Sequence, residues 1–173
     1  MNKNRIRALC ECGIFASLIA VFSQIAIPMP AGVPITLQTF IVALSSYYSG
    51  YKKGFASYLV YLSVGLMGMP VFSSFQGGVS ALLGLTGGFL IGFVPFSFLI
   101  GFGKNQKRIK AFTLGFLSLI ILHLSGVIFY MFIAKSDFIS AFLVISLPYL
   151  LKDYLSIILS FEVSKILIKR IKL

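Results

Sequence analysis

The sequence predicts an all-α integral membrane protein with six transmembrane helices and both termini in the cytoplasm. Three observations lead to this prediction: the composition, a series of apolar segments and the distribution of charge between them. Of the 173 residues, 58% are hydrophobic and 11% are charged, and the mean hydropathy is +1.00. A soluble domain carries roughly 25% charged residues. The chain has too little polar surface to cover a soluble core, so the bilayer is the predicted solvent.

The apolar segments are separated by short breaks, and a membrane-spanning helix needs about 20 apolar residues, with a range of about 17–25. The first, fifth and sixth segments are long enough, whereas the second and third are short and are expected to be tilted, kinked or extended by loop residues. The first apolar run is too long for a cleavable signal peptide. No segment suggests a second domain, so residues 1–173 are predicted to form one membrane domain. The predicted helices are 6–27, 35–50, 54–69, 85–103, 111–134 and 142–168.

The charges alternate between the gaps. The gaps 28–34 and 70–84 contain no Lys or Arg, and the gap 135–141 contains only Lys135. Cytoplasmic loops are the Lys/Arg-rich ones, so both termini are predicted to be cytoplasmic and the charge-poor loops to be external. This distribution argues against nucleic-acid binding despite the net charge of +11. The predicted cytoplasmic cations are Lys3, Arg5, Arg7, Lys52, Lys53, Lys104, Lys107, Arg108, Lys110, Lys165, Lys169, Arg170 and Lys172.

The first two charge-poor loops have unusual sequences. The first, IPMPAGVPITLQTF, has three prolines within seven residues, and the second, GMPVFSSFQGGVSALLGLTGGFLIG, is rich in Gly and Ser. Proline fixes φ and removes a donor, and glycine permits positive φ. Irregular backbone at membrane depth is tolerated only where protein covers it or it lines a cavity. We therefore predict lids over an outward-facing pocket, with tight re-entrant connections as the alternative.

Ionisable residues inside the apolar segments are candidates for function. Glu11 lies about one turn from Arg7, and Glu162 lies three residues before Lys165, so both carboxylates are expected to pair near the cytoplasmic surface. His123 is in the middle of its segment and is expected to make a helix–helix hydrogen bond.

Asp153 is the main candidate among them. It lies about one turn past Pro148, in the outer part of the last predicted helix, where its carboxylate could accept hydrogen bonds from an N–H-bearing ligand. The alternative is a surface ion pair with Lys152 or Lys135. Adjacent residues diverge by about 100° on a helix, so Asp153 and Lys152 are not expected to point at one spot easily.

Several motifs of catalytic and metal sites are absent from the sequence. There is no G-x-x-x-x-G-K-[ST], and GFGK at 101–104 lacks its spacing and its Ser/Thr. There is also no H-E-x-x-H and no G-x-S-x-G, and carboxylates are too few for a metal cage. Cys10 and Cys12 would point to different faces of one helix and are expected to be packing residues. We therefore predict no catalytic residue, no metal and no cofactor, and expect that the chain is not an enzyme.

Small residues recur every four positions in the first predicted helix, at Ala8, Cys12, Ala16 and Ala20. Such a stripe forms a groove that lets another helix come close. The partner helix could belong to this chain or to another protein.

Three ordered blocks resemble the BioY family, the biotin-binding S components of energy-coupling factor transporters. They are PMPAGVPITLQTF (28–40), GLMGMPVFSSFQGGVSALLGLTGGFLIGF (65–93), and a Pro-containing start to the last helix with an Asp. The first two cover about a quarter of the chain, and the six-helix layout extends the resemblance over the rest.

The resemblance implies a multi-pass, high-affinity biotin-binding subunit in a bacterial plasma membrane. It would mediate uptake with a transmembrane T component and two ABC-type ATPases, which would hydrolyse the ATP. In this family small residues of the first helix contact the T component, and Ala16 and Ala20 match that A-x-x-x-A pattern. Loops 28–36 and 70–86 match those that cover the vitamin, and Asp153 matches the position expected to bind the biotin head group.

Biotin has an apolar bicyclic body, a ureido group and a carboxylate, which suit an apolar pocket with a few placed polar groups. If the second helix begins at Pro34, only one of Thr36 and Gln38 can face the pocket, and we expect Gln38; Thr36 contacts ligand only if the lid is extended there. Phe75 is a further aromatic candidate. The predicted substrate-binding residues are Asp153, Gln38, Thr36, Gln76, Thr86, Tyr149, Ser156, Phe72 and Phe89, and the predicted partner-interface residues are Ala8, Cys12, Ala16 and Ala20.

The chain departs from the family pattern at residues 151–156, where Leu-Lys-Asp-Tyr-Leu-Ser stands in place of the usual P-G-D-x-x-K. Ser156 replaces the family lysine, and Lys152 is a candidate to compensate. The usual G-P-T-G-G reads Gly-Leu-Thr-Gly-Gly at 84–88. Two alternatives therefore stay open: an S component for thiamine, riboflavin or a lipoate-like acid, and a membrane interaction protein that is not a transporter.

Overall fold

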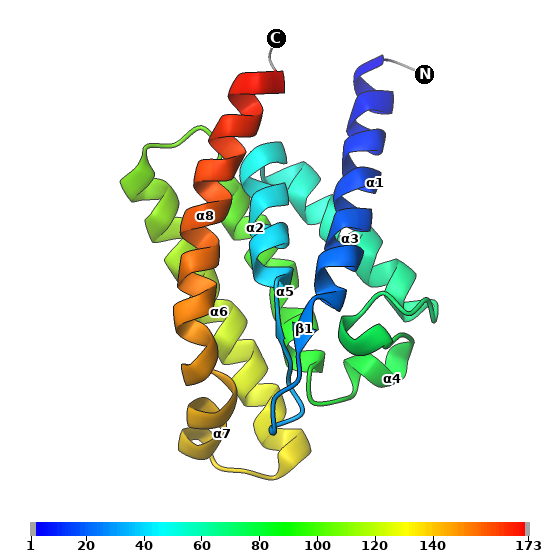
Figure 1. Ribbon diagram of the computed structural model, residues 1–173, viewed down its shortest axis with the longest axis vertical. Helices are drawn as coiled ribbons and strands as arrows, with labels where there is room; N and C mark the ends of the chain where they lie inside the picture. The colour runs from blue at the N-terminus through cyan, green and yellow to red at the C-terminus, as the bar shows by residue number, and fades with distance from the viewer. Residues whose placement is uncertain (1–2, 172–173) are drawn as a thin grey trace.

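Helices make up most of the computed structural model, which describes residues 3–171, and this confirms the all-α prediction (Figure 1). Lys172 lies outside the described residues. The longer helices correspond to the predicted segments, and short elements lie in the loops between them. In chain order the elements are α1 (Lys3–Gln24), β1 (Ala26–Ile27), β2 (Ile35–Thr36), α2 (Gln38–Ser49), α3 (Tyr51–Leu66), η1 (Ser73–Phe75), α4 (Val79–Leu82), α5 (Gly87–Ile100), η2 (Gly101–Gly103), α6 (Arg108–Ala134), α7 (Phe138–Ile145) and α8 (Leu147–Ile171).

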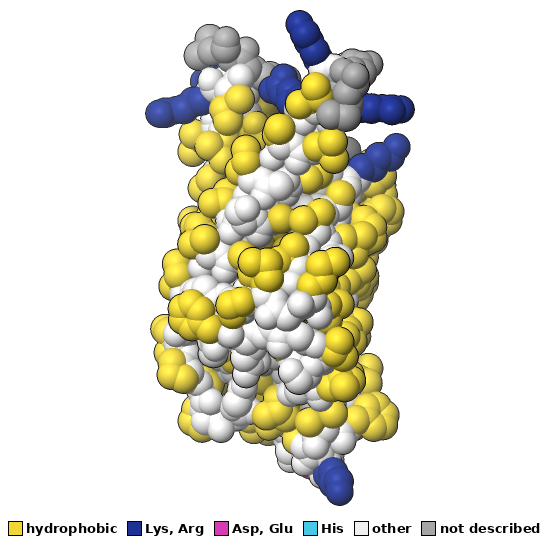
Figure 2. Space-filling model, turned by 90° about the vertical axis from the view of Figure 1, so that its right-hand side faces the viewer, with side chains coloured by type: hydrophobic (Ala, Val, Ile, Leu, Met, Phe, Trp, Pro, Cys, Tyr) yellow, Lys and Arg dark blue, Asp and Glu magenta, His cyan; other side chains and the backbone are white. Residues whose placement is uncertain are grey.

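The surface and the long helices are those of a multi-pass membrane protein. Among the described residues, α1 and α6 are each long and apolar enough to cross a bilayer, and α7 with α8 makes a third span if the bent pair is counted as one. Helices α2, α3 and α5 have 12, 16 and 14 residues, which is below the usual minimum of about 17. The count of six spans therefore stays a prediction. In the middle of the face shown in Figure 2 the coloured side chains are hydrophobic, whereas Lys and Arg side chains lie toward its ends.

Basic side chains gather at one end of the molecule. The start of α1 and the end of α8 lie at this end (Figure 1), and Lys and Arg side chains surround it in Figure 2. The arrangement accords with the predicted location of both termini on one side of the membrane. We call this the cytoplasmic end, following the charge-based prediction, and the opposite end the outer end.

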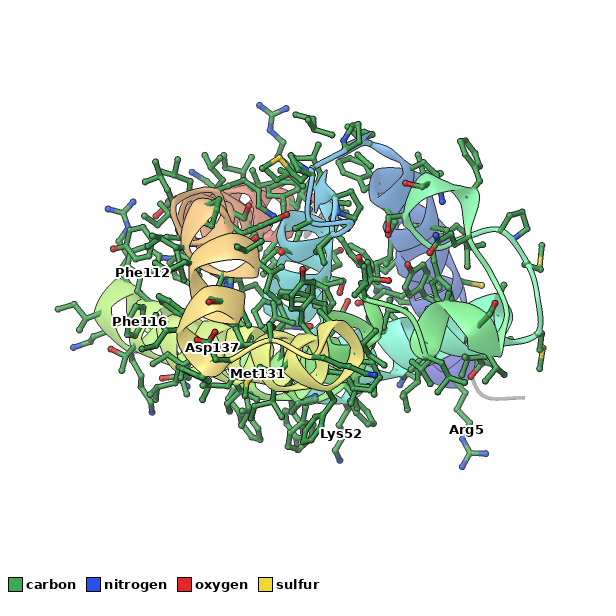
Figure 3. The ribbon with its side chains drawn as sticks, turned by 90° about the horizontal axis from the view of Figure 1, so that it is seen from below. Arg5, Lys52, Phe112, Phe116, Met131 and Asp137 are labelled. Carbon is green, nitrogen blue, oxygen red and sulfur yellow. The ribbon has the colours of Figure 1, made fainter. Side chains whose placement is uncertain are left out.

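The last predicted helix, 142–168, is broken rather than continuous. Helices α7 and α8 meet at Ser146 with a bend of 50°. Pro148 accounts for the break, because in a continuous helix its ring would clash with the carbonyl of residue 144. In the first turn of α8 its missing N–H costs nothing. Asp137 caps α7 by accepting a 3.0 Å hydrogen bond from the Ser140 backbone N–H, near the tip of the outer end (Figure 3).

The chain between α1 and α2 is more extended than predicted. Helix α1 ends at Gln24 instead of residue 27, because Ala26 and Ile27 pair antiparallel with Thr36 and Ile35. Helix α2 then begins at Gln38 instead of residue 35. The prediction for the helix boundaries is wrong here, and the consequence is that Thr36 lies in extended backbone.

The segment between α3 and α5 contains the short elements η1 and α4 and is tied to α1 by one side chain. The Gln24 amide nitrogen donates to the Phe72 carbonyl at 2.9 Å, and its amide oxygen accepts from the Phe75 backbone N–H at 3.0 Å. Next to this segment, Gly88 and Gly92 let α5 approach α6 closely, since a Cβ at Gly88 would lie 2.6 Å from the Ser125 carbonyl oxygen. The Gln24 hydrogen bonds hold the segment between α3 and α5 against α1, and the glycines bring α5 close to α6.

Candidate functional site

A small cavity lies at the outer end, beneath the two charge-poor loops. Its volume is about 50 Å³, well below the roughly 300–1,000 Å³ of typical ligand pockets. A ligand of ordinary size could fit only if the loops or the lining side chains moved apart. The lining residues are Val33, Pro34, Thr36, Gln38, Thr39, Phe72, Ser73, Thr86, Phe89, Leu90, Phe93, Leu122, Tyr149, Lys152 and Asp153.

Asp153 provides the buried negative charge of the cavity. It projects from α8 and is only 4% exposed. Its Oδ2 lies 3.3 Å from His123 Nε2 on α6, and the His123 Nδ1 is 2.9 Å from the Ser146 hydroxyl. The predicted helix–helix hydrogen bond of His123 is therefore confirmed. A buried carboxylate is costly unless it is paired and hydrogen-bonded, and the His123 ring is one nearby partner for it.

Lys152 also reaches this carboxylate. Its Nζ lies 2.5 Å from Asp153 Oδ1 and donates to the Thr36 carbonyl at 3.0 Å. The expectation that the two neighbours would not point at one spot easily is wrong, because the flexible four-carbon stem of Lys152 lets its ammonium reach the Asp153 carboxylate. The predicted ion pair between them exists, with the Asp153 side chain 5% exposed and the Lys152 side chain 25% exposed, and the hydrogen bond from Lys152 to Thr36 joins α8 to β2.

A second polar group in the cavity wall comes from the start of α2. The Gln38 amide nitrogen donates to the Tyr61 hydroxyl at 3.2 Å, and that hydroxyl is also 3.2 Å from the Ser23 hydroxyl. All three residues are buried. Because these bonds hold the Gln38 side chain between α1 and α3, its amide is presented to the cavity in a fixed orientation.

The two loops touch each other and α8 over the cavity. The Tyr149 hydroxyl donates to the Val33 carbonyl, which fastens the first loop to α8. Gly32 has φ +76°, and a Cβ there would lie 2.8 Å from Leu85 Cδ1 in the second loop. A side chain there would need the positive φ that favours glycine and would require Leu85 to shift, so Gly32 suits the close contact between the two loops.

The arrangement resembles known proteins over the whole chain. The model of the BioY family matches residues 1–172. The chain belongs to the BioY family.

Named relatives of this BioY chain agree with the family match. It is 44% identical over 109 residues to "Biotin transporter BioY" of Thermotoga maritima, which covers 63% of this chain and 64% of that protein. It is 36% identical over 141 residues to "Probable biotin transporter BioY" of Pyrococcus horikoshii, covering 81% and 83%. A crystal structure of the S-component for biotin from an ECF-type ABC transporter superposes with a TM-score of 0.88, at 25% identity, over 98% of this chain and 95% of that one.

The cavity of the BioY chain brings together most of the residues predicted to bind substrate. Those that line it are Thr36, Gln38, Phe72, Thr86, Phe89, Tyr149 and Asp153. Thr36 and Gln38 both face the cavity, because Thr36 lies in a strand and the helix begins two residues later.

The other predicted residues lie outside the lining. Gln76 is exposed and lines a separate outer groove of about 330 Å³, which also includes Thr86. Ser156 lies one turn further along α8 than Lys152 and donates to its carbonyl at 2.8 Å. Phe75 is 72% exposed and does not line the cavity. The roles of Gln76 and Ser156 in binding stay predictions.

Several residues of the site were not identified from the sequence. Thr39 and Ser73 were missed as lining residues, and His123 was not connected to Asp153. For Thr39 a signal existed, since it follows the selected Gln38 directly. For His123 none existed, because only the packing of α6 against α8 shows that a residue 30 positions away contacts Asp153.

Both carboxylates near the cytoplasmic end have partners other than those expected. Glu11 Oε2 forms its ion pair with Lys53 Nζ on α3, at 2.7 Å, and not with Arg7. Glu162 Oε1 lies 2.9 Å from Arg108 Nε on α6. Lys165 instead lies over the Phe161 ring, 4.2 Å from its centroid. In both cases an inter-helix contact replaces the pair predicted within one helix.

The small-residue stripe of α1 faces the interior of this chain. Ala16 is 6% exposed and belongs to the hydrophobic core, and Ala20 packs against that core. The Cys12 thiol lies 3.6 Å from the Lys53 carbonyl on α3, whereas Ala8 is half-buried. Of the two partner helices that the sequence left open, the internal one is therefore present.

Within residues 3–171, no group of three or more His, Cys, Asp or Glu side chains could hold a metal ion. The prediction that the protein needs no metal or cofactor is untested.

Proposed function

We propose that this protein is the biotin-binding S component of an energy-coupling factor transporter. The observation that carries the proposal is the buried Asp153 carboxylate at the wall of an apolar, aromatic cavity beneath two loops. The names of the relatives and of the superposed structure support biotin as the ligand. In this role the protein is a transport subunit and not an enzyme.

The chemistry of the lining suits each part of biotin. The Asp153 carboxylate can accept a hydrogen bond from one of the two ureido N–H donors, which point away from each other on either side of the ureido carbonyl. Gln38 presents an amide and Thr39 a hydroxyl to the same cavity, and either can donate to the ureido carbonyl. Phe89 and Tyr149 supply aromatic surface for the apolar bicycle. A ligand that combined these contacts would be bound mainly by apolar burial and oriented by a few hydrogen bonds.

We assign the carboxylate of biotin to Lys152. Its ammonium lines the cavity and already donates to the Thr36 carbonyl at the rim. The family lysine at position 156 is replaced by serine in this chain, so a cation one turn earlier would compensate for it. Exchanging its contact with Asp153 for the ligand carboxylate would also free that side chain for the ureido group.

Binding requires the two loops to separate. The cavity of about 50 Å³ is too small for a typical ligand, and the hydrogen bond from Tyr149 to Val33 holds the first loop against α8. We propose that the loops open to admit biotin and close over it, with the contact between Gly32 and Leu85 as part of the closed seam. Gln76 would reach the ligand only through a shift of the second loop.

Isothermal titration of the purified protein with biotin, thiamine, riboflavin and lipoate tests the ligand. We expect submicromolar binding of biotin and no heat with the other three. Binding of another vitamin without binding of biotin would support the alternative S component, and no binding of any of them would favour an interaction protein that does not transport.

We propose that the protein acts in a plasma membrane with a T component and two ABC-type ATPases. The small-residue stripe of α1 faces the interior of this chain. Ala20 is only partly buried, so of the two residues that match the A-x-x-x-A pattern it is the one that a partner helix could still reach. Ala20→Leu should reduce copurification of the T component, whereas Ile14→Phe on the exposed face should not. Loss with Ile14→Phe alone would move the contact to the lipid-facing side of α1.

A further inference from the structure

Two adjoining hollows lie at the cytoplasmic end. They are separate from the small outer cavity that Asp153 lines, which we call the vitamin cavity. One, of about 470 Å³, is formed by α1, α2, α3, the segment after η2 and α8. The other, of about 380 Å³, lies between the segment after η2 and α8. The two share Lys104, Asn105 and Ile168, so they form one groove that runs beside the end of α8. Figure 1 shows the start of α1 and the end of α8, which both contribute lining residues, at the same end of the molecule.

The groove carries an excess of positive charge. The lining cations are Arg7, Lys53, Lys104, Lys165 and Lys169. Among the described lining residues Glu11 is the single carboxylate, and it is paired with Lys53 at 2.7 Å. The amides of Asn4, Asn105 and Gln106 add further N–H donors. Ammonium, guanidinium and amide donors together are the groups that bind phosphate oxygens.

The edges of the groove are apolar. Ile168 and Ile171 line its wall, and Ile171 is 54% exposed. On the flanking helices, Leu9 of α1 is 63% exposed and Ile166 of α8 is 54% exposed. The cationic groove therefore lies where the surface changes from apolar to charged, which is the depth of the lipid head groups at the cytoplasmic face.

We propose that this groove binds the phosphate of an anionic phospholipid from the cytoplasmic leaflet. Basic pockets between transmembrane helices on the cytoplasmic side bind anionic head groups, and each nearby Lys or Arg contributes to that attraction. A lipid fits better than a soluble anion, because the adjacent apolar side chains can hold its acyl chains while the cations hold its phosphate. The site lies apart from the vitamin cavity and does not depend on the identity of the vitamin.

Native mass spectrometry of the full-length protein, titrated with phosphatidylglycerol in a neutral detergent, tests the proposal. The variant Arg7→Gln/Lys104→Gln/Lys169→Gln removes three cations from the groove. We expect its apparent affinity to fall at least tenfold, since each basic residue near the surface is worth roughly fivefold in binding. Phosphatidylcholine should bind equally to the variant and the wild type.

A matched control removes the same charge from the same end but outside the groove. Lys52, Lys107 and Lys110 are exposed and line neither hollow, and Lys52 projects away from the bundle in Figure 3. The control Lys52→Gln/Lys107→Gln/Lys110→Gln should change phosphatidylglycerol affinity less than twofold. An equal loss in both triple variants would overturn the proposal, because the effect would then follow net charge alone.

Two further measurements keep the test decisive. If the groove variant does not fold, a single change at the exposed Lys169 of α8 provides the test. Lys169→Gln should still weaken phosphatidylglycerol binding roughly threefold to fivefold. Inorganic phosphate at millimolar concentration should not displace the lipid. Displacement by phosphate would show a site for free anions and would also overturn the lipid assignment.

Discussion

Helix α8 carries one carboxylate near each end of the molecule, and the two are held in opposite ways. Asp153, toward the outer end, is 4% exposed and contacts Lys152 at 2.5 Å and His123 at 3.3 Å. Glu162, toward the cytoplasmic end, has a side chain 36% exposed and pairs with Arg108, which is itself 66% exposed. The comparison teaches that burial, rather than the presence of an ion pair, separates a binding group from a surface group on this helix.

The hollows at the two ends of the molecule also differ in size and in the balance of their charges. At the outer end the cavity is small, and its buried Asp153 carboxylate is paired with the partly exposed Lys152. At the cytoplasmic end the groove is several times larger, and among its lining residues within 3–171 the cations outnumber the one carboxylate. Buried and paired charges favour the recognition of one ligand geometry, whereas the attraction that exposed charges exert on an anionic head group is screened by salt. We expect changes at the outer end to alter vitamin binding and changes at the cytoplasmic end to leave it intact.

The largest effect is expected from Asp153→Asn. The change removes the charge that Lys152 and His123 contact and leaves the partly buried Lys152 ammonium without its counter-ion, so biotin should bind roughly 30-fold to several-thousand-fold more weakly. Titration calorimetry measures the change, with the thermal unfolding midpoint as a check of folding. Asp137→Asn is the matched control, because Asn also caps a helix and Asp137 lies outside the cavity. Unchanged affinity in Asp153→Asn would remove Asp153 from the site.

A smaller effect is expected from Gly32→Ala at the closed seam of the loops. Gly32 and Gly68 both have positive φ, +76° and +100°, so alanine should strain both by about 1–2 kcal/mol. A Cβ at Gly68 meets nothing within 4 Å, whereas one at Gly32 would press on Leu85. Biotin should therefore dissociate about tenfold faster from Gly32→Ala only. Equal dissociation rates in the two variants would show that the loops do not need this contact to retain the ligand.

The fold class and the ends of the molecule could be predicted from the sequence, because apolar length and loop charge act locally along the chain. The break in the last helix could not be predicted from length alone. Pro148 is visible in the sequence, but a proline can kink a helix or begin a new one, and the packing of α7 decides between them. The start of α2 was misplaced because the pairing of β1 with β2 overrides the apolar pattern of residues 35–37.

The site was predicted in part for a similar reason. Residues near the unusual loop sequences, such as Gln38 and Thr86, were found because local composition marks them. His123 and Lys152 were missed or misjudged as neighbours of Asp153. Their contacts depend on the packing between α6 and α8 and on the reach of a long side chain, and neither leaves a spacing pattern in the sequence.

A moderate effect on stability is expected from Ser146→Ala. The Ser146 hydroxyl is 2.9 Å from His123 Nδ1, so its loss leaves a buried ring nitrogen without a partner and should cost about 1–3 kcal/mol. Ser118→Ala is the control, because the Ser118 hydroxyl, also buried, bonds the Leu114 carbonyl within its own helix. Denaturant unfolding in micelles should show the larger loss for Ser146→Ala, together with weaker biotin binding. If both variants lost the same stability, His123 would not depend on this hydroxyl.

The smallest effect is expected from Glu162→Gln, which removes the exposed pair with Arg108. Exposed ion pairs contribute roughly 0.2–1 kcal/mol, because water and salt screen them and two long side chains must be ordered. The difference in unfolding free energy between variant and wild type should shrink toward zero at about 1 M salt, where the Debye length falls to about 3 Å. Biotin affinity should not change. A loss of affinity as large as that of Asp153→Asn would show that the two ends of α8 are coupled, since Glu162 lies far from the vitamin cavity and contacts none of its lining.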